Sequence, residues 1–459
     1  MRPVRLLVCL SLLLAAGAST VAADPAAARI SLKPRFGPPT SKVNVARTGF
    51  GASETVDVSF DTTPVTTAPT DPAGAFSARF KVPTTAVPGS HTVTATGETS
   101  GLTASAVFLV RTDWAKFHFD LTNSGFNPYE NVLGQGNVGS MVKLWSFAAG
   151  NPFYSPPTIV GGVAYAGSSD GNVYALNAST GVVLWSVNPN PSGYYVRTSP
   201  AVTNGVVFTG STAGIVDALK ASTGAKVWSF ATGGAVNTSP AVASGLVFVG
   251  SDDDSIYALN ASTGAKVWSF TTGSAVEGSP AVANGVVFVA SSDKSVYALN
   301  ASTGAKVWSF TAGNVVLSSP AVANGAVYVG SNDDKVYALN ASTGAKLWSF
   351  TTGSAVSASP AVANGVVYVG SADDSVYALN ASTGAKVWSF TTGSVVGSAA
   401  VANGVVYVSS FDNDEYALNA STGAKLWSLF NIGCTFPVVA NGMVYFGSGD
   451  HSLYAYGLP

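Results

Sequence analysis

A unit of about 40 residues recurs along the last two thirds of this 459-residue chain, and no other feature limits the possible folds so strongly. Residues 279–310 and residues 359–390 differ at only four of 32 positions. Each copy carries one tryptophan at the same place, and eight of the nine tryptophans follow this spacing: Trp145, Trp185, Trp228, Trp268, Trp308, Trp348, Trp388 and Trp427. Repeats of this length that are built from strands are typical of β-propeller blades.

Each copy contains four short segments of strand character, separated by residues that favour turns. In residues 359–390 the first two segments are joined through Asn364-Gly365, a dipeptide typical of two-residue β-hairpins. An Asp-rich turn at Asp373-Asp374 leads to the third segment, and Ala-Ser-Thr-Gly leads to the fourth, Lys-Val-Trp-Ser-Phe. No stretch shows helical periodicity of useful length. The sequence therefore predicts an all-β fold.

The number of blades follows from counting strands. Seven complete copies begin near Ser155, Ser199, Ser239, Ser279, Ser319, Ser359 and Ser398. Three more strands follow Trp427 without a closing tryptophan strand, and a tryptophan strand stands alone at residues 143–147, before the first copy. Joining these two ends completes an eighth blade and leaves no open sheet edge. We therefore predict an eight-bladed β-propeller of four-stranded blades, closed by strand exchange, over residues 142–459.

Three segments precede the repeats. Residues 1–23 combine Arg2 and Arg5 with an apolar run and a small-residue end, which predicts a secretory signal peptide cut before Asp24. Residues 29–111 alternate polar and apolar side chains in short segments, as expected for a small β-sandwich. Within them, residues 49–51 and 88–95 resemble bacterial immunoglobulin-like modules, so we expect an immunoglobulin-like β-sandwich. Residues 112–141 are predicted to be a linker that leads into the propeller.

Composition excludes several kinds of partner. Charged residues make up 10% of the chain, the net charge is −2 and the pI is about 5.9, so we expect no surface for nucleic acid. We also expect no membrane span, because the apolar run near the start is too short to be one. Removal of the leader leaves Cys434 as the only cysteine, which excludes an intramolecular disulfide. We expect a monomer that is secreted or held at the cell surface, or periplasmic in a host with two membranes.

The stretch Ala-Leu-Asn-Ala-Ser-Thr-Gly-Ala-Lys-Val-Trp-Ser resembles the tryptophan-docking repeat of the pyrroloquinoline quinone (PQQ)-like β-propeller family. The approach to the repeats, from Asp113-Trp114 to Asn127-Pro128, resembles the same family. This resemblance implies that the eight repeated tryptophans pack between neighbouring blades. The family contains quinoprotein dehydrogenases as well as non-enzymatic scaffolds, among them a propeller lipoprotein of outer-membrane barrel assembly.

A dehydrogenase of this family would need calcium held by carboxylate and amide oxygens, a tryptophan stacked on the quinone, a catalytic carboxylate and commonly a vicinal cysteine pair. Cys434 alone cannot form that pair, and Trp114 is the only tryptophan outside the repeated position. The three histidines lie in no metal-spaced or nucleophile motif. We therefore predict no catalytic residue, no metal site and no cofactor. The alternative is a PQQ- and calcium-dependent dehydrogenase that oxidises an alcohol or a sugar.

The position two residues before each Ser-Pro is the most variable column of the repeat. We expect it to start an inner strand, so that its copies ring the channel mouth: Phe153, Arg197, Asn237, Glu277, Leu317, Ser357, Gly397 and Cys434. Asn237 and Glu277 could supply two oxygens to calcium, and Arg197 could pair with an anionic group. Two ligands do not make a calcium site, and the other interpretation is a polar cluster around channel water.

The longest departure from the repeat is residues 188–197, which lengthen one loop by three residues and place Tyr194 and Tyr195 near the expected channel mouth. Exposed aromatic side chains beside an arginine are typical of binding hot spots, although drift of one loop would give the same pattern. We predict that Tyr194, Tyr195, Arg197, Asn237 and Glu277 bind a protein or glycan of the envelope or cell surface. The predicted function is a non-enzymatic binding or scaffold module at that location.

Overall fold

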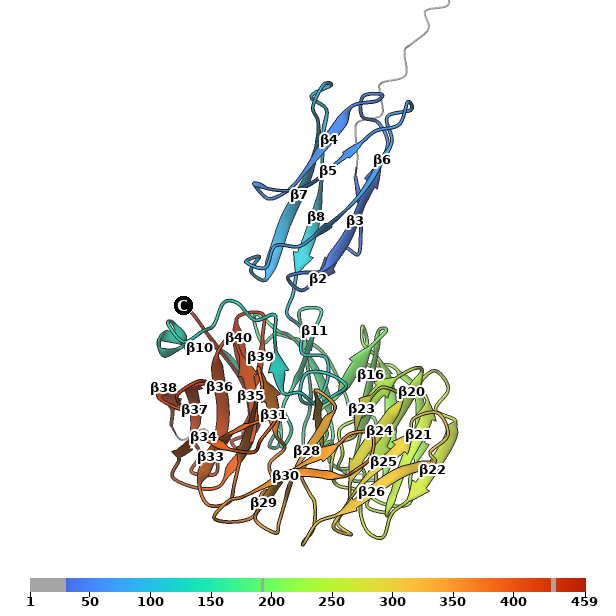
Figure 1. The fold of residues 1–459 in the computed structure, drawn as a ribbon. Helices are drawn as coiled ribbons and strands as arrows, with labels where there is room; N and C mark the ends of the chain where they lie inside the picture. Colours follow the sequence, from blue (N-terminus) through green and yellow to red (C-terminus); the bar gives the residue numbers. More distant parts are fainter. Residues whose placement is uncertain (1–29, 191–193, 431–434) are drawn as a thin grey trace, which may run out of the picture. The chain divides into compact units, whose positions relative to one another are not determined.

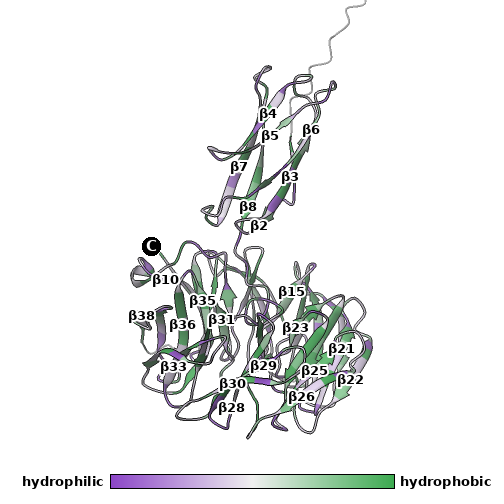
Figure 2. Cartoon of the chain, viewed as in Figure 1, coloured by the Kyte–Doolittle hydropathy of each residue, from purple (hydrophilic) through white to green (hydrophobic). Residues whose placement is uncertain are grey.

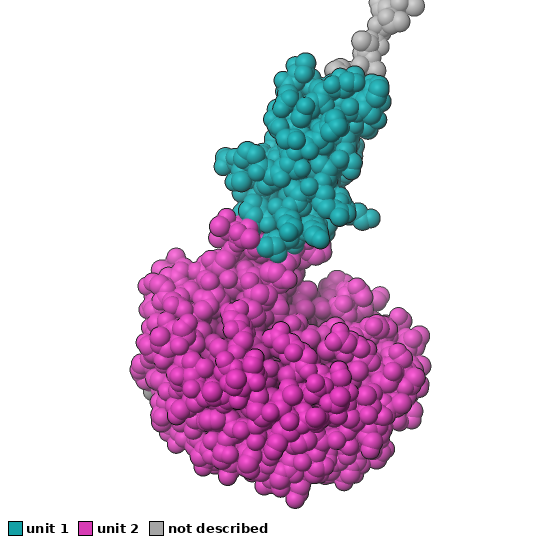
Figure 3. Space-filling model, viewed as in Figure 1, with its two compact units in different colours: residues 1–35, 40–83, 90–109 teal, residues 36–39, 84–89, 110–459 magenta. Residues whose placement is uncertain are grey.

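The computed structural model describes residues 30–190, 194–430 and 435–459 (Figure 1). The predicted signal peptide and Cys434 lie outside these residues. Apart from the 3₁₀ turn η1 (Val138–Ser140), every regular element of the described residues is a strand, as predicted. The chain divides into two units, coloured separately in Figure 3: the first is Met1–Arg35, Thr40–Pro83 and Ser90–Leu109, and the second is Phe36–Pro39, Thr84–Gly89 and Val110–Pro459.

The first unit is built around two sheets. One has the order β1 (Ser31–Lys33), β3 (Lys42–Arg47), β6 (Phe76–Lys81), and the other has the order β2 (Phe36–Gly37), β8 (Thr103–Val110), β7 (Gly89–Gly97), β4 (Thr55–Phe60), β5 (Thr63–Pro69). Alternate residues of β3 are buried, and the rings of Phe60 and Phe80, one from each sheet, lie 6.4 Å apart between centroids. The two sheets therefore share one apolar core, while the immunoglobulin-like identity of this unit stays a prediction.

The described residues of the second unit form eight blades of four antiparallel strands each, and one of them, blade 7, gains a fifth, parallel strand. Blades 1 and 2 consist of β11 (Thr158–Val160), β12 (Val163–Gly167), β13 (Val173–Asn177) and β14 (Val183–Val187), then β15 (Ala201–Thr203), β16 (Val206–Gly210), β17 (Ile215–Lys220) and β18 (Lys226–Ala231). Blades 3 and 4 consist of β19 (Ala241–Ala243), β20 (Leu246–Gly250), β21 (Ser255–Asn260) and β22 (Lys266–Thr271), then β23 (Ala281–Ala283), β24 (Val286–Ala290), β25 (Ser295–Asn300) and β26 (Lys306–Thr311).

The remaining blades follow the same plan. Blades 5 and 6 consist of β27 (Ala321–Ala323), β28 (Ala326–Ser331), β29 (Lys335–Asn340) and β30 (Lys346–Thr351), then β31 (Ala361–Ala363), β32 (Val366–Gly370), β33 (Ser375–Asn380) and β34 (Lys386–Thr391). Blade 7 consists of β35 (Val396–Ala402), β36 (Val405–Ser410), β37 (Glu415–Asn419) and β38 (Lys425–Leu429), and β9 (Phe126–Asn127) pairs parallel with β35. Blade 8 combines β39 (Val438–Ala440), β40 (Met443–Gly447) and β41 (Ser452–Gly457) with β10 (Val142–Ala148).

Blade 8 closes the ring by strand exchange, as predicted. Its outer strand β10 comes from before blade 1, and it pairs antiparallel with β41 from Val142 opposite Gly457 to Ala148 opposite Ser452. The pairing leaves β41 covered on both sides, by β10 and by β40. Closure therefore removes the free sheet edge that an incomplete last blade would expose.

The first strand of each blade is the inner one, and a chain of hydrogen bonds joins these strands at their beginnings. The backbone N–H of Ser199 donates to Ser239 Oγ at 3.0 Å, and Ser239 N–H donates to Ser279 Oγ at 2.9 Å. The same bond continues through Ser319, Ser359 and Ser398. These serines thus link consecutive blades from blade 2 to blade 7.

The apolar core lies between the blades. The strands of the second unit are mostly hydrophobic and the connecting turns hydrophilic (Figure 2). One buried cluster joins Phe288 and Val296 of blade 4 with Val327 and Leu339 of blade 5. Because a single blade has no partner for its two faces, each blade is buried only by its neighbours.

Tryptophan docking fixes the contact between consecutive blades. Trp268 of blade 3 donates its indole N–H to the carbonyl of Ala301 in blade 4 at 2.9 Å, and its ring lies against Gly304 in the same turn. The indoles of six other repeat tryptophans make the equivalent bond: Trp145 to Ala178, Trp185 to Ala221, Trp228 to Ala261, Trp308 to Ala341, Trp348 to Ala381 and Trp388 to Ala420. Trp427 packs edge-on against Tyr456 of blade 8, with centroids 5.8 Å apart.

Residues 113–127, here called the plug segment, run across the inner strands of the blades. Its carbonyl groups accept the backbone N–H of one residue in most of the inner strands: Ile159, Val202, Val282, Val322, Val362 and Val401. This N–H points away from the neighbouring strand, because the residue occupies the non-hydrogen-bonded position of its hairpin. The predicted linker is therefore an ordered part of the propeller core.

Blade 7 carries a buried carboxyl group where the neighbouring repeats have an aliphatic side chain. Glu415 replaces the equivalent of Val376, and Ser409, opposite it in register, replaces the equivalent of Gly370. Ser409 Oγ lies 2.6 Å from both Glu415 Oε2 and the carbonyl oxygen of Thr435. A serine hydroxyl has one proton, so both bonds form only when Glu415 is protonated and donates one of them. Burial raises the pKa of Glu415 to about 8, which agrees with a neutral carboxyl group.

Gly304→Ala tests the tryptophan dock. Gly304 has φ of +72°, and a Cβ atom there would lie 2.7 Å from two ring carbons of Trp268. We expect the free energy of unfolding to fall by about 2–4 kcal/mol, because overpacking adds to the cost of positive φ. Gly285→Ala is the matched control: Gly285 has φ of +76° with no heavy atom within 4 Å of that Cβ, and it should lose only about 1 kcal/mol.

Urea unfolding followed by tryptophan fluorescence measures both variants, and the signal reports the propeller because all nine tryptophans lie in the second unit. Equal losses in the two variants would show that the dock does not limit stability.

Glu415→Gln tests the buried carboxyl group. Because the pKa of Glu415 rises from 4.5 to about 8 on folding, the folded protein keeps a proton that the unfolded chain releases between these pH values. The free energy of unfolding should therefore fall as the pH rises through this window, by up to about 1.4 kcal/mol per pH unit, and level off above it. The glutamine variant lacks this component, so its stability relative to the natural chain should rise from pH 5 to pH 8. Parallel losses in both proteins, measured by urea unfolding at the two pH values, would refute the assignment.

Candidate functional site

Two sets of loops meet at one end of the propeller, here called the mouth face: the loops that lead into the inner strands and the turns between the second and third strands. Asp293 shows how they are joined. Its Oδ1 accepts the N–H of Ser295 in its own turn at 2.9 Å, and its Oδ2 accepts the Tyr297 hydroxyl at 2.6 Å and the Gly273 N–H of the preceding loop at 2.7 Å. Asp170, Asp253, Asp333, Asp373 and Asp412 each join a loop to a turn in the same way. These carboxylates hold the loops in place.

The lengthened loop of residues 188–197 has its own anchor. Asp217, which stands where the neighbouring blades have tyrosine, is buried and accepts hydrogen bonds from Asn190 Nδ2 and Ser229 Oγ at 2.7 Å each. Lys226 Nζ lies 3.2 Å from Asp217 Oδ1 and donates to the carbonyl of Pro189 at 2.7 Å. The departure from the repeat at Asp217 therefore ties the loop to blade 2.

The far end of this loop carries an aromatic–cation cluster. Backbone and hydroxyl bonds of 3.0 Å join Tyr195 to Thr212 in the next turn. The guanidinium of Arg197 lies 4.9 Å from the ring centroids of both Tyr195 and Tyr154. Tyr194 lies beside this group in sequence and is also exposed. Stacking of this kind holds an arginine in one orientation while leaving ring surface open to a partner.

The exposed aromatic side chains in the described residues of the propeller, 142–459, all belong to mouth-face loops. The exposed fractions are 75% for Phe411, 61% for Phe430, 53% for Tyr154, 46% for Tyr194 and 42% for Tyr195. Phe411 lies in the turn of blade 7, where its N–H donates to Val395, and Phe430 directly follows β38 on the way to blade 8. Together the five residues come from consecutive junctions between blade 7 and blade 2.

Sequence analysis missed Tyr154, Phe411 and Phe430. The signal that could have found them is the repeat itself, since Phe411 replaces the equivalent of Ala372 and Phe430 replaces the equivalent of Thr311. The other blades have no aromatic residue at these positions, so an aromatic ring there is not needed to pack a blade. Such a substitution indicates a role for the side chain at the protein surface.

A second, polar group lies on the mouth face of blades 3 and 4. Asn237 Nδ2 donates to Asp252 Oδ2 at 3.0 Å, and Glu277 Oε1 accepts from Ser292 Oγ at 3.3 Å. Burial first, and then the negative charge of Glu277, raise the pKa of Asp252. Asn237 and Glu277 are themselves exposed, so this group is a solvated acidic patch on the mouth face.

The variable column does not start the inner strands, which corrects one expectation. β15, β19 and β23 begin four residues after Arg197, Asn237 and Glu277, respectively, so these side chains belong to the preceding loops. The Ser-Pro dipeptide delays the start of the inner strand, because proline lacks the N–H that strand pairing would use. Phe153 is fully buried, Gly397 lies within β35, and Cys434 is outside the described residues.

The mouth face fits a calcium-bound quinone poorly. Asp252, Glu277 and Asn237 supply its nearest group of oxygen ligands, whereas calcium takes 6–8 oxygens. No group of three or more His, Cys, Asp or Glu side chains in the described part of the chain is arranged to hold a metal ion. Trp114, the one tryptophan outside the repeat, is buried at the plug segment and pairs with Ile159.

Among the described residues, no helix has the length and apolar character needed to cross a membrane.

Comparison with solved structures supports the fold. BamB from Moraxella catarrhalis aligns with a TM-score of 0.61 and 20% identity, over 69% of this chain and 99% of that one. The quinohemoprotein alcohol dehydrogenase ADHIIG from Pseudomonas putida HK5 aligns with a TM-score of 0.67 and 17% identity, over 76% and 80% of the two chains. The computationally designed Ika8 protein aligns with a TM-score of 0.63 and 19% identity, over 69% and 99%. These identities establish a shared propeller fold and nothing of the chemistry.

The propeller repeats match a known protein family. No curated protein sequence matches the chain significantly. The family model described as "Outer membrane protein assembly factor BamB" matches four overlapping stretches, residues 142–235, 212–319, 296–429 and 391–457. These stretches cover the whole propeller and well over half of the chain, so the chain belongs to this family of PQQ-like propeller repeats.

Proposed function

We propose that this protein is an exported, non-enzymatic binding module that holds a protein partner at the cell envelope or surface through its mouth face. The observation that carries the proposal is the arc of Tyr154, Tyr194, Tyr195, Phe411 and Phe430 around Arg197. Tyrosine and arginine are the residues most enriched at protein interface hot spots. A soluble domain rarely gathers its exposed aromatic side chains on one face without a partner for them.

The tryptophans pack between blades, whereas the exposed tyrosines and phenylalanines lie on loops, and this difference supports a binding role. The repeat tryptophans are engaged between blades, with seven indole N–H groups donated to the next blade. The mouth face is left with tyrosine and phenylalanine on loops. An acidic patch at Asp252 and Glu277 and the stacked Arg197 lie on the same face. A partner surface with exposed apolar groups and basic side chains complements this arrangement.

The envelope location rests on the family and on the predicted leader. The family description names an outer membrane protein assembly factor, and residues 1–23 have the pattern of a secretory signal peptide. Both support a scaffold outside the cytoplasm, in agreement with the fold shared with BamB.

Photo-crosslinking tests the proposed face. A benzophenone amino acid at position 194, in the full-length chain expressed in its host, should give one discrete protein adduct. The same group at position 307, an outer-strand valine of similar exposure, is the matched control and should give none. Combining the probe at 194 with Tyr195→Ala and Arg197→Ala should reduce the adduct at least about tenfold, because two hot-spot contacts are lost, while the melting temperature stays unchanged. Adducts that form equally at both positions, or that persist in the double variant, would defeat the placement.

The alternative is a PQQ-dependent dehydrogenase. It is supported by the similarity to the fold of ADHIIG and by the side-chain oxygen atoms of Asn237, Asp252 and Glu277. We expect PQQ to show no calcium-dependent binding to the metal-stripped protein, because these groups supply too few ligands. Tryptophan quenching and equilibrium dialysis, with and without calcium, measure this directly. Binding at one site per chain in the micromolar range, lost in Glu277→Gln, would establish the dehydrogenase instead.

A further inference from the structure

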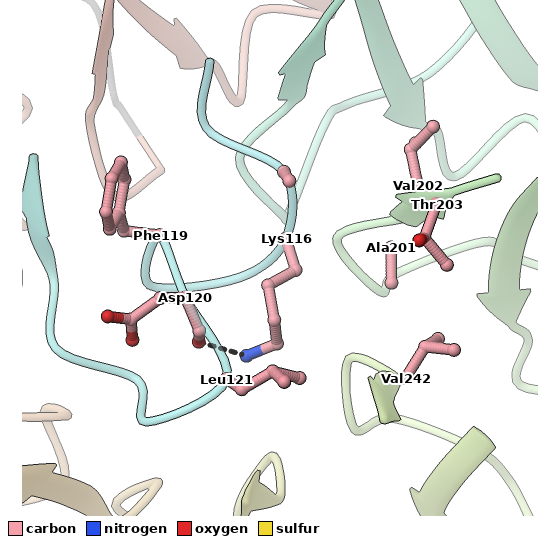
Figure 4. Close-up of a pocket in the computed structure, with 9 residues that line it drawn as sticks. Lys116, Phe119, Asp120, Leu121, Ala201, Val202, Thr203 and Val242 are labelled. Atoms are coloured by element: carbon pink, nitrogen blue, oxygen red, sulfur yellow. Dashed lines mark hydrogen bonds between the residues drawn. The ribbon is translucent and has the colours of Figure 1, made fainter. Parts of the chain in front are cut away.

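A cavity of about 330 Å³ lies between the plug segment and two inner strands (Figure 4). Its walls are the plug segment on one side, with Lys116, Phe119 and Leu121, and the inner strands of blades 2 and 3 on the other, with Val202 and Val242. The volume is in the range of small-molecule sites, and most of the lining is apolar.

The cavity lies beside blade 3, one of two blades whose inner strand makes no backbone bond to a carbonyl group of the plug segment; the other, blade 8, is held through the side chain of Asn127. The carbonyl groups of the plug segment accept the inner-strand N–H in blades 1, 2, 4, 5, 6 and 7. Val242 is the equivalent residue of blade 3, and within the described residues its N–H has no hydrogen-bond partner. Between Lys116 and Leu121 the plug segment turns away through His118 and Phe119, which adopt φ of +52° and +74°. Two consecutive non-glycine residues in this conformation are strained, and such strain often marks a functional site.

A buried cation faces this cavity. Lys116 is 5% exposed, and its ammonium donates to the carbonyl of Phe117 at 2.8 Å, to the carbonyl of Asp120 at 3.1 Å and to Asn123 Oδ1. It forms no ion pair with any carboxylate of the described residues. Burial lowers its pKa to about 7. The negative charge of Asp120 acts against this shift, but Asp120 makes no ion pair with the ammonium, so a further anion nearby would stabilise the charged form of Lys116.

The nearest carboxylate is occupied elsewhere. Asp120 Oδ1 accepts the N–H groups of Thr122 and Ser124 at 3.0 and 3.1 Å and the Thr122 hydroxyl at 2.7 Å. Figure 4 shows the Asp120 side chain turned away from Val202 and Val242. The cavity therefore combines an apolar wall, an open backbone donor and a buried ammonium group that no carboxylate of the described residues contacts directly.

We propose that this cavity binds a small monocarboxylate with an apolar body. The carboxylate accepts the Val242 N–H and lies in the field of the Lys116 ammonium, while the apolar body packs on Phe119, Leu121 and Val202. This site shares no residue with the mouth face. If the carboxylate site is refuted, the proposed function still stands, and if the proposed function is refuted, the carboxylate site still stands.

Calorimetric titration of the full-length protein tests the site, with octanoate as the probe and 1-octanol as its neutral counterpart. Octanoate should bind at one site per chain and at least about tenfold more tightly than 1-octanol. Its affinity should fall when the pH is raised from 6 to 9, because Lys116 loses its proton near pH 7 while the probe stays ionised. No octanoate binding, or equal binding of the two probes, would overturn the proposal.

Two variants separate the site from general effects. Lys116→Met keeps the apolar stem and should weaken octanoate about tenfold or more, whereas the exposed Lys294→Met is the matched control and should leave it unchanged. Since Lys116→Met also removes three hydrogen bonds, Val242→Phe provides a second route that fills the cavity and keeps the cation. Octanoate binding that survives in Val242→Phe would place the ligand elsewhere and refute the site.

Discussion

Contact between consecutive blades is the interaction on which the rest of the molecule depends. A four-stranded blade exposes two apolar faces, and only its neighbours can bury them. The tryptophan of one blade reaches over a glycine turn of the next, and its indole N–H satisfies a carbonyl there. Near the axis, the serine hydroxyl groups at the start of blades 3 to 7 each accept an N–H from the blade before. The near-identity of the repeats follows, since a residue that serves two blades has little freedom to change.

The same constraint determines where the sequence is free to vary. Loops at the mouth face contribute little to these contacts, provided that one aspartate per turn still holds the preceding loop. Aromatic residues, the stacked Arg197 and the anchoring Asp217 have accumulated there. Glu415 shows what happens when variation enters the core instead, because a carboxyl group at a valine position has to keep its proton.

The repeat arithmetic was sufficient to predict the architecture, including the pairing of a strand near residue 145 with the last strand of the chain. It was less reliable for positions next to proline, where the inner strands begin four residues later than the column containing Arg197 and Glu277. Phe411 and Phe430 could have been identified as departures from the repeat, whereas Tyr154 lies outside the repeat's conserved part. The bonds of the plug segment could not be predicted. They use backbone carbonyl groups, which leave no pattern in the side chains. The side-chain hydrogen bonds from the plug segment to the blades are few, and they involve Asp113, Asn123 and Asn127.

Strand exchange in blade 8 has a consequence for how the chain reaches this state. β10 is made long before β41, and the two must find each other across seven intervening blades that resemble one another closely. During synthesis or export, blades can dock one after another, but the ring stays an open spiral until β41 emerges. Copies this similar can also pair in the wrong order, skipping a blade. The plug segment is not repeated, and it contacts the inner strands in sequence order. It therefore favours the ring in which every blade is present and in its correct order, which the similar repeats alone cannot specify.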